Sequence, residues 1–304
     1  MANWEGKTRG GLLGYKIFVF LIRYAGLRTA YGLLLFVAFY FVFFSPSASR
    51  SIYSFFRKRL GKSRRASLWG IYKTYWAFGQ ALIDRTAVLA GFGQQFSYDF
   101  DGEHYIQDMA KAGAGGILLS IHGGNWAMAG SMLEENVGQN ARINIIMLEA
   151  EHQKIQAFLA NIQVQQAANI IGIGDDFSHI IAMGSALRNG ELLCMHGDRF
   201  LPKAETIAVN FLGETAHFPA GPFQLIHRMK VPYSFVFAFK ETLRHYHFYA
   251  TPGQQYPTSP QAAAQQFAHD IEKQLQKYPY QWYNFYDFWA TPTTEKTSLQ
   301  TNNG

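Results

Sequence analysis

Hydrophobic and polar residues follow two different patterns along this chain. Residues 17–44 form one long apolar segment, whereas from about residue 104 short apolar runs alternate with stretches of helical spacing. Short apolar runs bounded by turn residues are typical of buried strands. The pattern predicts strands at 116–121, 143–148, 169–173, 192–196, 208–211, 232–239 and 245–250. It predicts helices at 126–136, 151–167, 177–189, 220–229 and 260–277. The predicted fold class is therefore α/β, a mixed sheet with helices on its faces.

The apolar segment at residues 17–44 predicts a helix that precedes this domain. Its uncharged part, residues 29–44, is 16 residues long, shorter than the ~20 residues that span a bilayer comfortably. Extending it back to residue 17 includes Arg23 and Arg28. A tilted transmembrane helix, a monotopic or re-entrant anchor and the core helix of a soluble domain are the three interpretations. Basic residues flank the segment, which favours membrane attachment.

Positive charge is concentrated at the N-terminus. Residues 1–65 contain 12 Lys and Arg against one acid, whereas residues 66–304 have a net charge of −5. Charged residues are only 16% of the chain, below the roughly 25% of soluble domains. A basic region beside an apolar one favours an anionic membrane over nucleic acid as the partner, and no nucleic-acid motif accompanies it. The apolar residues of "RSIYSFFRKRLGKSRR" (50–65) fit either a helix lying on lipid or a helix with a solvated basic face.

These patterns predict three regions. Residues 1–45 form a basic segment with the anchor helix, residues 46–290 form the α/β domain, and residues 291–304 form a polar tail.

The candidate chemistry lies in "ILLSIHGGNWAM" (117–128), where an apolar strand ends in His122. Sites in open α/β sheets gather at the carboxyl ends of strands. Gly123 and Gly124 allow the backbone to approach a ligand closely, and a helix that starts near Asn125 directs free N–H groups at developing negative charge. The stretch therefore predicts a general base beside an oxyanion site. The alternative is a hydrogen-bonded histidine that caps a turn.

Other common active-site patterns do not occur in the sequence. There is no Gly-x-Ser-x-Gly nucleophile turn and no phosphate-binding P-loop. His245 and His247 share one strand face, but no third ligand stands at metal-site spacing. We therefore expect neither a metal nor an organic cofactor.

Four further blocks follow "HGGNW" in order, and together they resemble a known family. The bacterial lipid A late acyltransferases, a branch of the lysophospholipid acyltransferase superfamily that includes lauroyl- and myristoyltransferases, have similar blocks. The matching stretches are "LLCMHGDRF" (192–200), "HFPAGPFQL" (217–225), "KVPYSFVFAF" (230–239) and "YPYQWYNFYDFW" (278–289). The resemblance covers about residues 5–290. It implies a glycerol-phosphate-acyltransferase-like fold anchored by its N-terminal helix on the cytoplasmic face of the inner membrane of a Gram-negative bacterium.

The resemblance also implies a reaction and its participants. A fatty acyl chain would pass from the thioester of acyl carrier protein to a hydroxyl of a phosphorylated lipid A precursor, with His122 as the base. Backbone N–H groups of Gly123, Gly124 and Asn125 would hold the oxyanion. The residues that would bind substrate are Trp126, Asp198, Arg199, Lys203, Phe218 and Gly221.

The sequence departs from the family pattern at Ala127, where the superfamily signature has an acidic residue that would orient His122. Without that carboxylate we expect the base to be poorly oriented and the chain to be impaired. An inactivating substitution of Glu explains this better than natural loss of catalysis, because the other blocks are all present.

Two alternatives to lipid A acylation stay open. One is the same chemistry on an ornithine lipid or an acceptor of the aryl polyene type, and the other is a non-catalytic lipid-binding protein of the membrane.

Overall fold

A computed structural model describes residues 12–126, 128–130, 141–148, 169–174, 176, 178–200, 204–253 and 257–290, with side chains from residue 17 onward. The α-helices are α1 (Leu12–Phe44), α2 (Pro46–Ser54), α3 (Arg64–Ala87), α4 (Glu103–Ala112), α7 (Ser178–Arg188), α8 (Ala220–Met229) and α9 (Pro260–Lys277). Short helical turns cover η1 (Phe55–Arg59), η2 (Val88–Phe92) and η3 (Gly93–Gln95). The strands are β1 (Ser97–Asp101), β2 (Gly116–Ser120), β3 (Ile143–Leu148), β4 (Asn169–Ile173), β5 (Leu192–His196), β6 (Thr206–Phe211), β7 (Glu214–Pro219), β8 (Tyr233–Lys240) and β9 (His245–Ala250).

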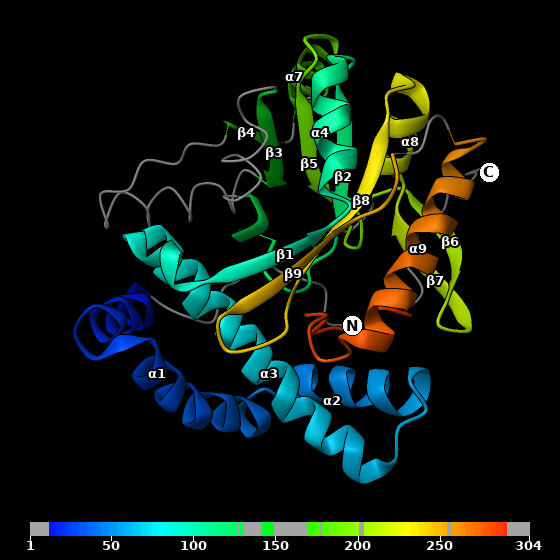
Figure 1. Cartoon of the computed structure of the whole chain (residues 1–304). Helices are drawn as coiled ribbons and strands as arrows, with labels where there is room; N and C mark the ends of the chain where they lie inside the picture. Colours follow the sequence, from blue (N-terminus) through cyan, green and yellow to red (C-terminus); the bar gives the residue numbers. More distant parts are fainter. Residues whose placement is uncertain are drawn as a thin grey trace, which may run out of the picture.

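Seven strands form the central sheet in the order β1-β9-β8-β2-β5-β3-β4 (Figure 1). Neighbours from β8 through β4 are parallel, β9 is antiparallel to β8, and β1 is parallel to β9. Strands β6 and β7 form a separate antiparallel pair. Parallel neighbours bring the carboxyl ends of β2 and β5 to one edge, with Ser120 paired to His196. This edge is where ligand sites are expected in such sheets.

Alternation of side chains along β2 explains how both faces of the sheet are covered. Ile117 and Leu119 join a core that includes Phe267 of α9. Leu118, which points to the opposite face, joins a second core with Ile106 of α4. A strand buried on both faces is apolar throughout, so its sequence shows a continuous run rather than alternation.

The N-terminal helix α1 packs along α3 at one side of the sheet (Figure 1). It is kinked at Gly26, whose φ of 79° and ψ of 166° are not helical. By length and composition its segment Ile17–Phe44 could cross a membrane, and 28% of the apolar window is buried inside the protein. The buried side chains are Ile22, Leu27, Ala30, Tyr31, Leu34 and Ala38, and the large exposed ones include Phe20, Tyr24, Phe36, Phe39, Tyr40, Phe43 and Phe44.

The segment at residues 50–65 contributes apolar side chains to the protein core. Ile52, Phe55 and Phe56 are buried in the main core, with the Phe55 ring 5.3 Å from that of Trp282. Arg59 lies over the ring of Trp289 at 4.4 Å. These buried side chains belong to the protein core and do not form an apolar face on lipid, whereas contact of the segment's basic residues with a membrane stays a prediction.

The predicted α/β class with a mixed sheet is confirmed, and the seven predicted strands are present with small shifts at their ends. Strands β1 and β7 and helices α3 and α4 were not predicted. Strand β1 reads "SYDFD", which has acids at alternate positions and no apolar run. The predicted helix at 151–167 and the tail at 291–304 lie outside the described residues, and the predicted division into regions stays a prediction.

Candidate active site

A tight turn at the carboxyl end of β2 carries His122, and we call residues 122–125 the catalytic turn. Gly124 has a φ of 60°, and a Cβ there would lie 1.7 Å from the carbonyl oxygen of Ala238. Only glycine satisfies both the backbone conformation and this close approach. The side chain of Asn125 then accepts a hydrogen bond from the Met128 N–H, and Asn125 is therefore the N-cap of the next helix.

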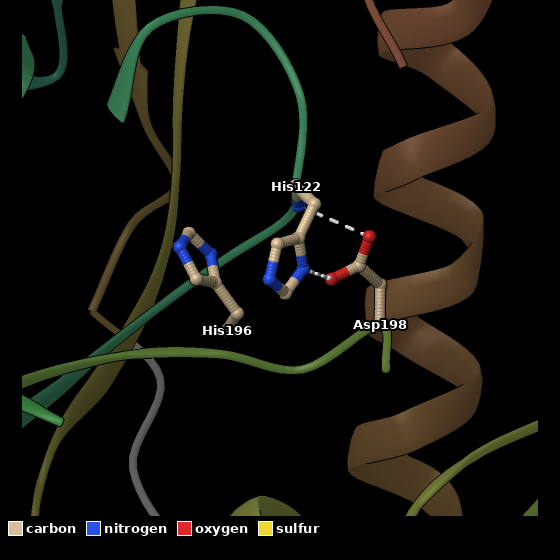
Figure 2. Close-up of side chains that lie close together, drawn as sticks. All are labelled: His122, His196 and Asp198. Carbon is tan, nitrogen blue, oxygen red and sulfur yellow. Dashed lines mark hydrogen bonds and ion pairs between the residues drawn. The ribbon is translucent and has the colours of Figure 1, made fainter. Parts of the chain in front are cut away.

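The imidazole of His122 is held by a buried carboxylate from the neighbouring strand end (Figure 2). Its Nδ1 lies 2.6 Å from Oδ1 of Asp198, and the His122 backbone N–H donates to Oδ2 at 3.0 Å. The Asp198 side chain is 2% exposed, whereas that of His122 is 21% exposed. A carboxylate in this position selects the tautomer with hydrogen on Nδ1 and leaves Nε2 as the basic nitrogen.

Asp198 is itself fixed and kept charged. The indole N–H of Trp282 donates to Oδ2 at 3.2 Å. Burial would raise the pKa of this carboxyl group, but the charge and hydrogen bond of His122 and the nearby Arg199 hold the pKa well below its usual range. The carboxylate is therefore an acceptor at any pH near neutrality.

These contacts correct one expectation from the sequence. His122 was expected to lack an orienting carboxylate because position 127 is alanine, and Asp198 was expected among the substrate-binding residues. Ala127 lies outside the described residues, but Asp198 contacts the imidazole Nδ1 through one carboxylate oxygen and accepts the His122 backbone N–H through the other. The missed signal is topological, because Asp198 follows β5 by two residues just as His122 follows β2 by two.

His196 is a second imidazole in the site that the sequence analysis did not single out. Its ring lies 4.2 Å from that of His122 and 5.0 Å from that of Trp126, between centroids. Figure 2 shows the two imidazoles side by side, with Asp198 on the far side of His122. Burial, together with the neighbouring His122, lowers the pKa of His196 well below its ordinary value, so this ring is neutral. Its Nδ1 is buried without a hydrogen-bond partner among the described residues.

The backbone amides expected to form an oxyanion site are used inside the protein. The N–H groups of Gly123, Gly124 and Asn125 donate to the carbonyls of Ile121, Gln281 and Ala238, at 2.8, 2.7 and 2.8 Å respectively. These three hydrogen bonds contradict the oxyanion site that was expected from the glycine pair. The reason is tertiary: the C-terminal segment around Gln281 and strand β8 pack directly against the catalytic turn.

The other predicted substrate-binding residues fall in different places. The half-buried Trp126 lies beside His196, with the Arg85 guanidinium 5.4 Å from its ring centroid. Arg199 donates to the carbonyl oxygen of Tyr283 at 2.5 Å. Phe218 is fully buried in the core, which contradicts a role in contacting substrate. Two more predicted residues are Gly221, exposed in the first turn of α8, and Lys203, outside the described residues.

The donor atoms of His122, His196 and Asp198 lie within 4.8 Å of one another, the one such trio found in the described part of the chain. Imidazole and carboxylate donors suit zinc. Both carboxylate oxygens, however, already accept hydrogen bonds from His122 or Trp282. The trio is therefore better described as a base with its orienting carboxylate than as a metal centre.

The chain also matches a known protein family. The profile of the family described as bacterial lipid A biosynthesis acyltransferase matches residues 75–291, which contain the catalytic turn, Asp198 and the C-terminal segment. A search of curated proteins finds no match. The match spans more than half of the chain, so this protein belongs to the bacterial lipid A biosynthesis acyltransferase family.

Proposed function

We propose that this protein transfers a fatty acyl chain from the thioester of acyl carrier protein to a hydroxyl of a lipid A precursor, as the lauroyl- and myristoyltransferase branch does. His122 is the general base and Asp198 is the carboxylate that orients it. The observation that carries the proposal is the 2.6 Å contact between His122 Nδ1 and the buried Asp198 Oδ1. The family match supports acyl transfer as the reaction class.

The proton and acyl transfers follow from this pair. Nε2 of His122 takes the proton of the acceptor hydroxyl, and Asp198 stabilises the imidazolium that forms. The hydroxyl oxygen attacks the thioester carbon, and the tetrahedral intermediate collapses with cleavage of the carbon–sulfur bond. The imidazolium returns its proton to the carrier thiolate. No acyl-enzyme forms, and Cys194 is a poor nucleophile because burial raises the pKa of its thiol to about 12.

This mechanism does not require a carboxylate at position 127. The expectation that the chain is impaired rested on Ala127 leaving His122 without a partner. Asp198 supplies a buried acceptor at hydrogen-bond distance from Nδ1, which removes that reason. We therefore propose that this chain is active with alanine at 127.

Substrates and membrane would be held by charge and by the apolar helix. Arg199, which follows Asp198 directly, and Lys203 would pair with acceptor phosphate, since Arg binds phosphate in bidentate fashion. The basic residues at 1–65 would attract acidic carrier protein and anionic lipid. The exposed aromatic residues of α1 would enter the cytoplasmic leaflet of the inner membrane.

The test is acyl transfer from acyl carrier protein to a lipid A precursor by four proteins. We expect the parent chain to be active, and His122→Gln and Asp198→Asn each to lose about 10³–10⁴-fold in rate. Ala127→Glu should change the rate by less than about tenfold, because the orienting role is already filled. An inactive parent chain that Ala127→Glu activates by orders of magnitude would return that role to position 127.

The same assay separates the acceptor from the chemistry. If lipid A precursor is not acylated but the parent chain hydrolyses the thioester, and His122→Gln does not, the catalytic proposal holds and the acceptor is another lipid, such as an ornithine lipid or an aryl polyene type. If neither the parent nor Ala127→Glu consumes the donor, a non-catalytic lipid-binding role replaces the enzymatic one.

A further inference from the structure

A second polar cluster is buried between α1, α3 and the ends of β8 and β9, and the reaction above does not use it. Its centre is Asp84 of α3, which is fully buried. Tyr31 of α1 and Tyr246 of β9 donate their phenolic O–H groups to its two carboxylate oxygens, and Lys240 of β8 completes an ion pair with it. Lys240 also lies 3.0 Å from the Tyr31 oxygen. We call these four residues the Asp84 cluster.

The cluster reaches the catalytic turn through Asn125. The Nδ2 group of Asn125 donates to the Tyr246 hydroxyl and to the Ala81 carbonyl, both at 3.2 Å. The same side chain accepts the Met128 N–H that starts the next helix. Asn125 therefore links the Asp84 cluster to the backbone three residues after His122.

A second route leads from Lys240 to the residue before Asn125. The side chain of Gln281 accepts the Lys240 N–H at 2.9 Å and donates to the Lys240 carbonyl at 2.7 Å. The carbonyl of Gln281 accepts the Gly124 N–H at 2.7 Å. Two consecutive residues of the catalytic turn are thus linked to the cluster, Gly124 through Gln281 to the Lys240 backbone and Asn125 directly to Tyr246.

Apolar side chains also connect α1 with the region of the catalytic turn. Met128 belongs to the core cluster that contains Leu27, Tyr31 and Leu34 of α1. Helix α1 is thereby joined to the catalytic turn by polar contacts through Tyr31, and it shares a core cluster with Met128, three residues after the turn.

We propose that Asp84 and Tyr31 are positioning residues for acyl transfer: the docked helix α1, through the Asp84 cluster, holds Asn125 and the catalytic turn in their productive geometry. This inference rests on the proposed function. The helix that faces lipid is then a support of the active site as well as an anchor, and acyl transfer depends on α1 being seated on α3. Preorganised sites of this kind lose rate when their supporting contacts are loosened.

The test uses the full-length protein and the pair Tyr31→Phe and Thr29→Val. Both changes remove one hydroxyl from α1, but Tyr31 is buried in the cluster whereas Thr29 is exposed and donates only to the Ala25 carbonyl of its own helix. We expect Tyr31→Phe to lower kcat about tenfold with little change in KM, and Thr29→Val to leave kcat unchanged. Tyr246→Phe, which breaks the next link, should match Tyr31→Phe.

A double-mutant cycle distinguishes positioning from a purely structural role. Because Tyr31 acts through Asn125 in this proposal, Tyr31→Phe combined with Asn125→Ala should lower kcat no more than Asn125→Ala alone. Effects that multiply, or a Tyr31→Phe protein that melts earlier but keeps its kcat, would overturn the proposal. Failure of the proposed function has a different outcome, in which His122→Gln and Asp198→Asn retain full activity.

Discussion

Two buried aspartates in this protein, Asp198 and Asp84, have pKa values that are shifted in opposite directions. At Asp198, His122 and Arg199 outweigh the cost of burial and the pKa falls well below its usual range. At Asp84, burial is the larger influence and the pKa rises despite Lys240 and two tyrosine hydroxyls. The Asp198 site is open on one side, since His122 is 21% exposed, whereas Asp84 is sealed from solvent. A carboxylate that orients a base must stay charged. A buried carboxyl group that only links structural elements needs hydrogen-bond partners but need not be charged.

The comparison predicts that substitutions at the two sites have different effects on activity and stability. Loss of a group around Asp198 should lower activity more than stability, and loss of the Lys240 charge beside Asp84 should lower stability more than activity.

The largest effect on stability is expected from Lys240→Met. This change leaves the Asp84 charge buried without its ion-pair partner, which costs about 3–5 kcal/mol. Denaturant unfolding in detergent measures it. The control is Lys273→Met, which removes an ion pair whose lysine is 57% exposed and should cost at most about 1 kcal/mol. Equal losses for the two variants would show that the buried ion pair stabilises the protein no more than an exposed one does.

The second prediction concerns acid. Because the folded pKa of Asp198 lies below the unfolded value, its charged form stabilises the protein above about pH 4, and this contribution is lost as the pH falls through the folded pKa. We therefore expect the free energy of unfolding to decline more steeply below about pH 4 in the parent chain than in Asp198→Asn. The exposed Asp108 provides the matched control, Asp108→Asn, which should keep the parental slope. Identical slopes in all three proteins would contradict the prediction.

A smaller loss is expected from Trp282→Phe. The ring still packs between Phe211 and Phe288, but Asp198 loses one N–H donor at 3.2 Å. A hydrogen bond to a charged group contributes about 1.5 kcal/mol, so the rate of acyl transfer should fall about tenfold. Trp289→Phe removes an indole N–H bonded to the Phe211 carbonyl instead and should leave the rate near that of the parent. If both variants are equally slow, the loss reflects packing.

The smallest effect is expected from metal removal. Dialysis against a chelator should change the rate of acyl transfer by less than about twofold, because both oxygens of Asp198 are occupied by hydrogen bonds. Loss of activity that added zinc restores would instead assign the trio of His122, His196 and Asp198 to a metal centre.

The α/β class and the placement of His122 at a strand end follow from local pattern. Short apolar runs bounded by turn residues, such as "GILLS" in β2, are typical of buried strands, and a histidine with two glycines directly after one indicates the carboxyl edge of the sheet. Helices α3 and α4 and strand β1 were missed because their apolar residues lie among polar ones or on one narrow face. Local pattern alone does not distinguish such faces from solvated helices.

Other site features depended on contacts between distant residues. The glycines of the catalytic turn correctly indicated a close backbone approach, but the approaching groups are Ala238 and Gln281 rather than a ligand. The sequence could not indicate this, because those residues lie more than 100 positions away.

Residue types within short windows were enough to predict seven of the strands, the histidine at the end of β2 and the family resemblance. The carboxylate that contacts His122 became evident only in the folded protein. The position where the superfamily signature has an acidic residue is Ala127, which has no charge. Parallel pairing of β2 with β5 puts Asp198 beside the imidazole of His122, 76 positions earlier in the chain. The reason is that a hydrogen bond depends on distance in space, and a parallel sheet sets that distance through register rather than through separation along the chain.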